Sequence, residues 1–372
     1  MLYLKLFFLS IFFIIPLNAR EYIVFGASLP ANGIMKEWGE GVISGTESYF
    51  RYINETKTLP DKHLSFIYYD DKYEPDLTLK NTKILLNKNV FALLGFVGTP
   101  TVKNILSTVE DTQIPFIAPF TGAMFLRNEY QNTNIINLRP NYKQEIESIV
   151  NYLHIQKGIT EFAVFYQNDD YGHEGYTSLL EILDRYKLSL IAEGTYKRNT
   201  LSINHAFNEI QSTSPKAVIM IGAHRANSLF IQKAKTDVHF KNTIFATVSF
   251  GDANAMVKHI GNTSDNIIFS QVVPSYDDTS LPIIREYREI YSKYYPNKEY
   301  SFISLEAFIS AKIVTSALSS IDGNITKTKF IKTLKNLDMD LGGIRTKYHN
   351  YQLLNKVYLF EYKNGYFNEI YQ

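Results

Sequence analysis

The chain has 372 residues, of which 45% are hydrophobic and 20% charged, a composition typical of a globular protein large enough for two domains. Its formal net charge of +1 excludes the broad basic field that nucleic-acid-binding proteins use. It has no cysteine, which excludes disulfides, thiolate metal sites, cysteine nucleophiles and a lipid-modified N-terminal cysteine.

The first 19 residues, Met1–Ala19, have the features of a secretory signal peptide. Lys5 precedes the apolar stretch Leu6–Pro16, which is too short to span a bilayer comfortably, and the small residue Ala19 stands at the cleavage position. We therefore expect the mature chain to start near Arg20 and to diffuse freely in the periplasm of a Gram-negative cell. The alternative is an uncleaved N-terminal anchor.

From Glu21 onwards, short apolar patterns typical of strands alternate with patterns typical of helices. The expected strands are 21–28, 64–69, 91–96 and 114–118, and the helices among them include 35–51 and 77–87, the latter with Asp76 as its N-cap. This alternation predicts an α/β fold with a parallel sheet and right-handed crossovers.

After Asn137–Asn141 the same alternation begins again. The expected strands are 161–166, 188–192, 217–221, 243–247 and one from 267, with helices 144–156, 171–186, 203–210 and 226–234 between them and two long helices, 281–294 and 302–318, after them. The tail alternates apolar and polar residues from Tyr358, and Asn364-Gly365 predicts a hairpin turn. The repetition predicts two similar lobes.

Two loops of the first array carry small and hydroxyl residues where a strand ends. Gly98-Thr99 follows the strand 91–96, and Phe120-Thr121-Gly122 follows the strand 114–118. In an open α/β sheet, ligands bind outside the carboxyl ends of the strands. Hydroxyls and backbone amides there suit a small anionic or polar group. The alternative is that glycine and threonine only form turns and caps.

The segment Glu161–Gly175 (EFAVFYQNDDYGHEG), with the Gly98-Thr99-Pro100 and Thr121-Gly122-Ala123 loops, resembles the type I periplasmic solute-binding proteins of ABC importers. The branch it resembles is that of the leucine/isoleucine/valine-binding proteins. The resemblance implies two Rossmann-like lobes joined by three hinge crossovers. Lobe one would comprise residues 20–140 and 273–345, and lobe two residues 141–272 and 346–372. A ligand would lie between the lobes, and hinge closure would trap it.

The resemblance also implies which residues bind the ligand. The loops at Gly98-Thr99 and Phe120-Thr121-Gly122 match those that hold a ligand carboxylate. Trp38 and Tyr171 match bulky side chains that reach the ligand from the two lobes. Their alternatives are a core anchor for Trp38 and a packing residue at a helix start for Tyr171.

Two positions depart from the pattern of amino-acid binders. His224 stands where an aromatic contact is expected. Ser249 lies in the segment where a carboxylate would pair with the ligand ammonium, and Asp252 is the first acid there. Because an unpaired buried ammonium is costly, either Asp252 substitutes or the ligand lacks an α-ammonium. The alternatives are a helix N-cap for Asp252 and a solvated surface pair for His224 and Arg225.

The resemblance implies a binding protein that delivers a small amino acid, amide or carboxylate to an inner-membrane ABC permease. We expect a monomer that is not an enzyme and needs no cofactor, because no hydrolase, P-loop or dinucleotide motif is present. We also expect no metal site, since the eight histidines are scattered without ligand spacing. The alternative function is a sensor module that reports to a membrane receptor or kinase.

Overall fold

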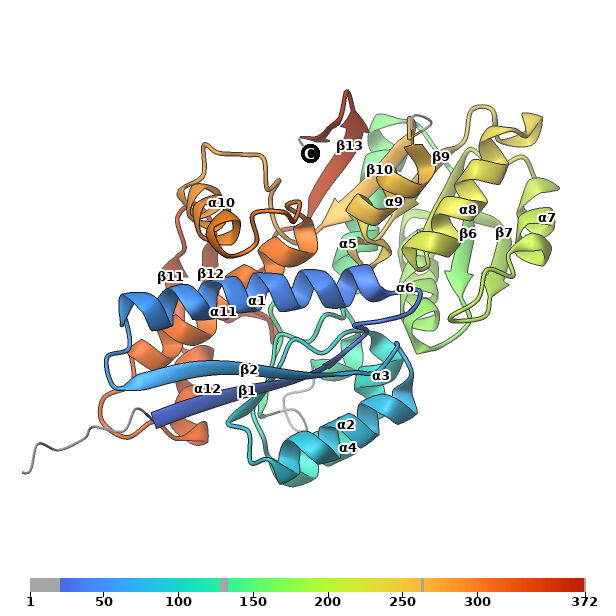
Figure 1. Cartoon of the computed structure of the whole chain (residues 1–372). Helices are drawn as coiled ribbons and strands as arrows, with labels where there is room; N and C mark the ends of the chain where they lie inside the picture. Colours follow the sequence, from blue (N-terminus) through green and yellow to red (C-terminus); the bar gives the residue numbers. More distant parts are fainter. Residues whose placement is uncertain (1–20, 128–132, 262–263, 371–372) are drawn as a thin grey trace, which may run out of the picture.

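A computed structural model describes residues 21–127, 133–261 and 264–370 as two α/β lobes (Figure 1). The expected signal peptide lies outside the described residues. We call the part built on the first sheet lobe one and the part built on the second sheet lobe two. The predicted parallel sheet of lobe one is confirmed, and the sheet of lobe two is parallel except for an antiparallel pair at one edge.

Lobe one has a five-stranded parallel sheet in the order β2-β1-β3-β4-β5. Its strands are β1 (Glu21–Leu29), β2 (Lys62–Asp70), β3 (Ala92–Leu94), β4 (Phe116–Ile117) and β5 (Ile135–Ile136), and its first helices are α1 (Lys36–Thr56), α2 (Pro75–Asn87), α3 (Thr99–Lys103) and α4 (Leu106–Thr112). The prediction of Asp76 as an N-cap was wrong. Pro75 opens α2, because its missing N–H costs nothing there, and Asp76 lies in the first turn.

Lobe two has a seven-stranded sheet in the order β14-β13-β10-β9-β8-β6-β7. Its strands are β6 (Glu161–Gln167), β7 (Ser189–Tyr196), β8 (Ala217–Ile221), β9 (Ile244–Thr247), β10 (Ile267–Gln271), β13 (Tyr358–Lys363) and β14 (Tyr366–Glu369). Its helices are α5 (Tyr142–Asn151), α6 (Asp170–Tyr186), α7 (Asn204–Gln211), α8 (His224–Lys235) and α9 (Ala253–Ile260). The predicted tail hairpin is confirmed, with Asn364 and Gly365 in the left-handed conformation that its turn requires.

The segment after β10 returns to lobe one. It forms α10 (Pro282–Tyr294), α11 (Phe302–Ser319), α12 (Lys327–Lys335) and the small antiparallel pair β11 (Asp338–Asp340) and β12 (Arg345–Lys347). Helix α11 lies beside α1 (Figure 1). A Cβ at Gly45 of α1 would lie 2.2 Å from the carbonyl oxygen of Ser304, so only glycine lets the two helices approach so closely.

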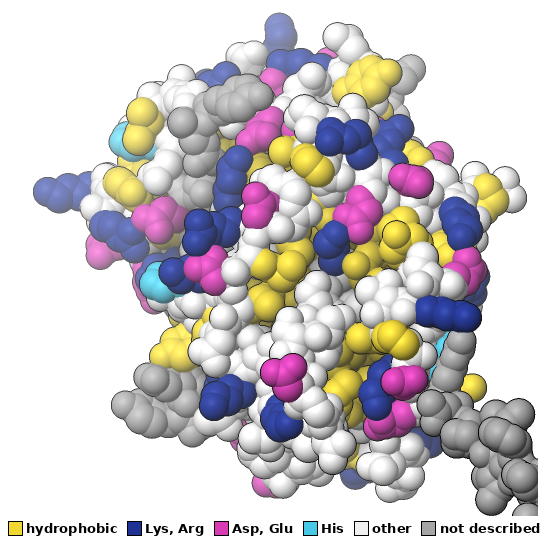
Figure 2. All heavy atoms as spheres, turned by 90° about the vertical axis from the view of Figure 1, so that its left-hand side faces the viewer, with side chains coloured by type: hydrophobic (Ala, Val, Ile, Leu, Met, Phe, Trp, Pro, Cys, Tyr) yellow, Lys and Arg dark blue, Asp and Glu magenta, His cyan; other side chains and the backbone are white. Residues whose placement is uncertain are grey.

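Helix α11 is also long and apolar enough, by length and composition, to cross a membrane. It is 83% buried inside the protein, as the core helix of a globular lobe would be. Figure 2 shows basic and acidic side chains interspersed over one face of the molecule, in keeping with the small net charge.

The chain passes between the lobes three times: after β5, after β10 and before β13. The first and third passages run side by side. Asn137 pairs with Gln352 in an isolated parallel bridge, and the amides of Leu353 and Leu354 donate to the carbonyls of Asn137 (3.1 Å) and Leu138 (2.8 Å). The passages therefore form a small hydrogen-bonded unit at the lobe boundary.

Arg139, on the first passage, joins the lobes through a buried polar network. Its guanidinium forms two hydrogen bonds to Glu306 of α11, 2.9 Å from Nε and 2.6 Å from Nη2, and Nη1 donates to Oγ of Ser249 at 3.2 Å. The hydroxyl and the amide of Ser249 donate to the carboxylate of Glu145 on α5, at 3.0 and 2.7 Å. One chain of contacts thus runs from lobe one to lobe two.

The charges in this network depend on one another. Burial by itself would lower the pKa of Arg139, but Glu306 and Glu145 raise it above the ordinary value. Burial raises the pKa of Glu145, and Arg139 with Ser270 and Ser249 opposes that rise. Removing one partner would leave an uncompensated charge in the interior.

We predict that Glu306→Gln lowers the free energy of unfolding by about 3–5 kcal/mol, because it leaves the guanidinium of Arg139 without its bidentate partner. The double variant Arg139→Met/Glu306→Leu should lose much less stability, because it removes both charges of the buried ion pair together. Denaturant unfolding measures both. The control is Asp338→Asn, which removes an exposed ion pair with Arg345 and should change stability little. A Glu306→Gln loss no larger than that of the control would contradict the prediction.

Candidate ligand-binding site between the lobes

Three hydroxyl groups meet at the carboxyl end of the lobe-one sheet. Thr99 opens α3, Thr121 follows β4, and their Oγ1 atoms lie 2.7 Å apart. The hydroxyl of Tyr142, the first residue of α5, lies 3.2 Å from Oγ1 of Thr99 and 3.3 Å from that of Thr121. Burial raises the pKa of Tyr142, so its hydroxyl is a neutral donor. Hydroxyl protons can rotate, so these donors can turn from one another towards an anion.

The sequence predicted that backbone amides of the two loops face a ligand, but two of these amides form hydrogen bonds within the protein. The amide of Gly98 donates to the carbonyl of Phe120 (3.2 Å), and the amide of Thr121 donates to the carbonyl of Pro119 (2.8 Å). A Cβ at Gly122 would lie 2.7 Å from the amide nitrogen of Tyr142, so this glycine permits close approach. Two of the predicted backbone donors therefore hold the loops together.

Aromatic rings from both lobes pack around Phe250. Trp38 of lobe one stacks on it, with ring centroids 4.8 Å apart and an interplanar angle of 26°. Tyr171 of lobe two lies 4.8 Å from it, and Tyr73 of lobe one 6.1 Å. Phe120 contacts Trp38 edge-on at 5.7 Å. The structure thus brings the predicted residues Trp38, Phe120 and Tyr171 into one cluster.

Two polar atoms in this cluster are buried without a hydrogen-bond partner among the described residues. They are Nε1 of Trp38 and the hydroxyl of Tyr171, whose side chains are 1% and 0% exposed. Core packing explains why these rings are buried, but it does not explain the unpaired atoms, since an unsatisfied buried donor costs about 1–3 kcal/mol. A polar ligand between the rings would satisfy them.

Ser249 has a structural function. Its hydroxyl donates to Glu145 and accepts from Arg139, so it is part of the network between the lobes. It also begins the short 3-10 helix Ser249–Gly251, which carries Phe250 into the aromatic cluster.

His224 and Asp252 lie in a charged corner beside the cluster. His224 is fully buried, so the alternative of a solvated surface pair with Arg225 was wrong. Its Nε2 lies 3.4 Å from Oε2 of Glu37, and Nη2 of Arg225 lies 3.7 Å from Oε1 of Glu37. Burial favours the neutral form of Glu37, but its interactions with His224 and Arg225 prevail and lower its pKa to about 2.

The helix N-cap alternative for Asp252 is confirmed. Its Oδ1 accepts from the amide of Ala255 at 3.1 Å, in the first turn of α9. Asp252 is buried, and burial raises its pKa although His224 opposes the rise.

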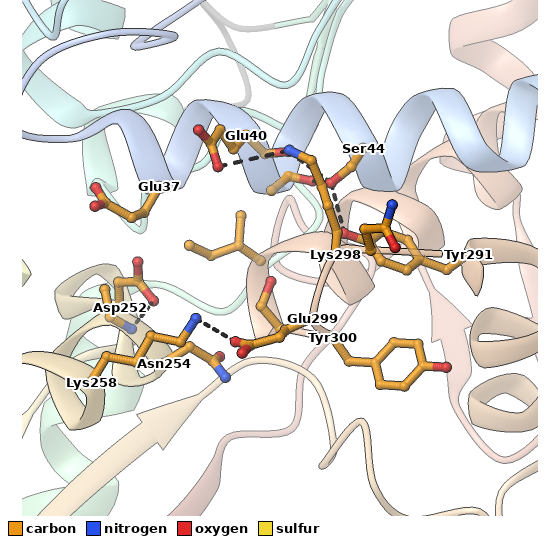
Figure 3. A pocket seen from close by; sticks show the side chains of 15 residues that line it. Glu37, Glu40, Ser44, Asp252, Asn254, Lys258, Tyr291, Lys298, Glu299 and Tyr300 are labelled. Carbon is orange, nitrogen blue, oxygen red and sulfur yellow. Dashed lines mark hydrogen bonds and ion pairs between the residues drawn. The ribbon is translucent and has the colours of Figure 1, made fainter. Parts of the chain in front are cut away.

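Two cavities are lined by residues of both lobes, although none of the rings of the aromatic cluster lines them. One, of about 370 Å³, lies between α1 and α9 and is lined by Glu37, Glu40, Asp252 and Lys258 (Figure 3). Figure 3 shows Glu37 and Asp252 at the same end of this cavity, reaching it from different helices. The other, of about 600 Å³, is lined by residues that include Lys103, Asp170 and Glu174.

Ion pairs join the rims of the lobes. Lys103 of α3 lies 2.5 Å from Asp170 of α6, and Arg198 of lobe two lies 2.9 Å from Glu74 of lobe one. Exposed pairs such as these stabilise little individually. Together with the buried aromatic cluster, these ion pairs hold the two lobes in a closed arrangement.

Three residues of the site, Tyr142, Phe250 and Glu37, were not predicted from the sequence. Phe250 and Glu37 adjoin the predicted residues Ser249 and Trp38, so their positions beside those residues were the available signal. Tyr142 begins the helix that follows the first passage between the lobes. No local pattern shows that its hydroxyl reaches the two threonines.

A family model described as periplasmic binding protein matches residues 23–366. The chain belongs to the periplasmic binding protein family. Its fold is that of the type I members, with two α/β lobes. A search of curated proteins gave no match.

Solved structures of other family members agree. A possible leucine/isoleucine/valine-binding protein from Rhodopirellula baltica is 32% identical, with a TM-score of 0.90 over 95% of this chain and 97% of that one. A leucine-binding protein from Thermotoga maritima is 14% identical, with a TM-score of 0.80 over 94% and 98%. An ABC transporter solute-binding protein from R. palustris, solved with benzoate, is 16% identical, with a TM-score of 0.83 over 94% and 95%. The last two show the fold alone.

We predict that Gly98→Ala destabilises this periplasmic binding protein by about 1–3 kcal/mol more than Gly33→Ala, because it overpacks the site. Both glycines have positive φ angles, 102° and 87°, so both substitutions strain the backbone. Only at Gly98 would the Cβ collide, 2.2 Å from Cε2 of the buried Tyr73, whereas Gly33 has nothing within 4 Å. Thermal unfolding of both variants measures the difference, and equal losses would contradict it.

Proposed function

We propose that this protein is the extracytoplasmic substrate-binding protein of an ABC importer. It captures a small polar or carboxylate-bearing solute between its lobes and presents it to a membrane permease. The observation that carries this proposal is the composition of the lobe interface. Hydroxyl donors of Thr99, Thr121 and Tyr142 lie beside rings from both lobes, two of which have unpaired polar atoms.

The charged groups around the cluster already have partners within the protein, so an ammonium is a poorer fit than a neutral or anionic polar group. Arg139 lies 5.7 Å from the ring centroids of both Trp38 and Phe120, but Glu306 pairs with its charge. Of the two nearby acids, Glu37 faces His224 and Arg225, and Asp252 caps α9. A small monocarboxylate or amide with an apolar part fits this setting. Such a solute would place its polar end on the hydroxyls and its apolar part against Trp38, Phe120 and Tyr171.

Two of the similar proteins support this class. The Rhodopirellula protein is named for leucine, isoleucine and valine, and the R. palustris protein was solved with benzoate. All four are monocarboxylates with an apolar part, and only the first three have an α-ammonium. A thermal-shift panel of leucine, its keto-acid analogue 4-methyl-2-oxopentanoate and benzoate therefore separates recognition of the carboxylate from recognition of the ammonium. A ligand at a hundred times its dissociation constant adds about 2.7 kcal/mol, which such an assay detects.

For a carboxylate that binds, we predict that Thr99→Val and Thr121→Val each weaken affinity about ten- to a hundredfold, because a hydrogen bond to a charged group contributes about 1.5–3 kcal/mol. Calorimetry measures this. The matched control is Thr101→Val, in the same helix α3 as Thr99, since the Thr101 hydroxyl donates to the carbonyls of Val97 and Gly98. The affinity of Thr101→Val for the carboxylate should stay unchanged. Unchanged affinity in both test variants would contradict the proposed carboxylate subsite.

A further inference from the structure

Three side chains with metal-binding atoms meet at the lobe boundary from three separate helices. Glu37 comes from α1 of lobe one, His224 begins α8, and His259 lies on α9 of lobe two. One candidate ligand atom from each lies within 4.8 Å of the other two. The two imidazole rings are nearly parallel, with centroids 5.6 Å apart and an interplanar angle of 6°.

The centre of this group is a buried histidine whose nearest charged partner is Glu37. His224 is fully buried, and neither of its ring nitrogens has a hydrogen bond to a described residue. Oε2 of Glu37 also has none, although Nε2 of His224 lies only 3.4 Å away. Native proteins rarely leave buried polar atoms unpaired, because each costs about 1–3 kcal/mol. A ligand bound by these atoms would satisfy them.

Nε2 of His224 and Oε2 of Glu37 lie 3.4 Å apart, at the spacing of two ligands on one metal ion. The three ligand atoms together lie within 4.8 Å, so the exposed His259 would move closer when an ion binds. Two ligands of a tetrahedral ion with bonds of about 2.0–2.1 Å lie about 3.3–3.4 Å apart. Charged groups of both signs surround the three side chains. Arg225 lies 3.7 Å from Oε1 of Glu37, which leaves Oε2 facing His224, and an outer-shell partner can orient a ligating carboxylate in this way. The carboxyl group of Asp252 also interacts with His224.

We propose that Glu37, His224 and His259 bind one late first-row divalent metal ion, with zinc(II) as the best fit. Two imidazoles and one carboxylate form a common zinc ligand set that leaves a position for water or another ligand. The ion can enter from solvent, because His259 is exposed and Glu37 lines the cavity of Figure 3. The arrangement assigns His224 to a metal and not to the transported solute.

The site would sense closure of the cleft. Glu37 belongs to lobe one and both histidines belong to lobe two, so all three ligands meet only when the lobes are together. An ion that binds one state better than another shifts the population towards that state, by as much as its affinities differ. Zinc would therefore favour the closed form, in addition to the solute proposed above.

The test is calorimetric titration of the untagged, chelator-treated protein with zinc chloride in the absence of any organic solute. We expect one zinc ion per chain, and no measurable binding of magnesium, which prefers oxygen ligands. His259→Asn should weaken zinc binding at least tenfold, since even outer-shell changes cost about 10–100-fold. His205→Asn, at an exposed histidine on α7, is the matched control and should leave binding unchanged.

Glu37→Gln removes the ligand from lobe one and should also weaken zinc binding at least tenfold. Circular dichroism checks that both variants fold. Absence of zinc binding, or affinity unchanged in His259→Asn and Glu37→Gln, would overturn the proposal. Because no organic solute is present, a negative result would leave the carboxylate site untouched. Conversely, failure of the carboxylate panel would leave this titration valid.

Discussion

The structure depends on a buried ion pair at the point where the two lobes meet. Arg139 leaves the lobe-one sheet, holds Glu306 of α11 by two hydrogen bonds, and reaches Glu145 of lobe two through Ser249. A buried charge that loses its partner is strongly destabilising, so this network fixes where the first passage between the lobes runs. The same guanidinium lies against Trp38 and Phe120, so the constraint that joins the lobes also positions the rings of the candidate site.

Around this fixed point, the interface divides into parts with different chemistry. One part is a cluster of neutral hydroxyl donors, from Thr99, Thr121 and Tyr142. The second is an apolar wall formed by rings of both lobes around Phe250. The third is the charged corner at Glu37 and His224. Most of these side chains are fully buried in the closed arrangement. A solute can reach them only if the lobes separate, which makes hinge opening a requirement of the proposed function and not an addition to it.

Much of the fold could be predicted from the sequence, because buried parallel strands such as Ala217–Ile221 read as uninterrupted apolar runs. The helices α9 and α12 and the β11–β12 pair were missed, since elements of 8, 9 and 3 residues are too short for an apolar period to repeat clearly. Thr99 and Thr121 could be predicted to lie together because parallel strands end at one edge of a sheet. The roles of Tyr142, Glu306 and His259 depend on contacts between distant segments, which no local spacing encodes.

The proposed function requires the lobes to close on a small carboxylate. Small-angle X-ray scattering of the protein before and after saturation with a carboxylate from the thermal-shift panel measures this closure. We expect the ligand-free protein to sample a more open shape, and the ligand to reduce the radius of gyration and bring the profile to that of the closed structure. Scattering profiles that are identical with and without saturating, calorimetrically confirmed ligand would contradict closure as the mechanism of capture.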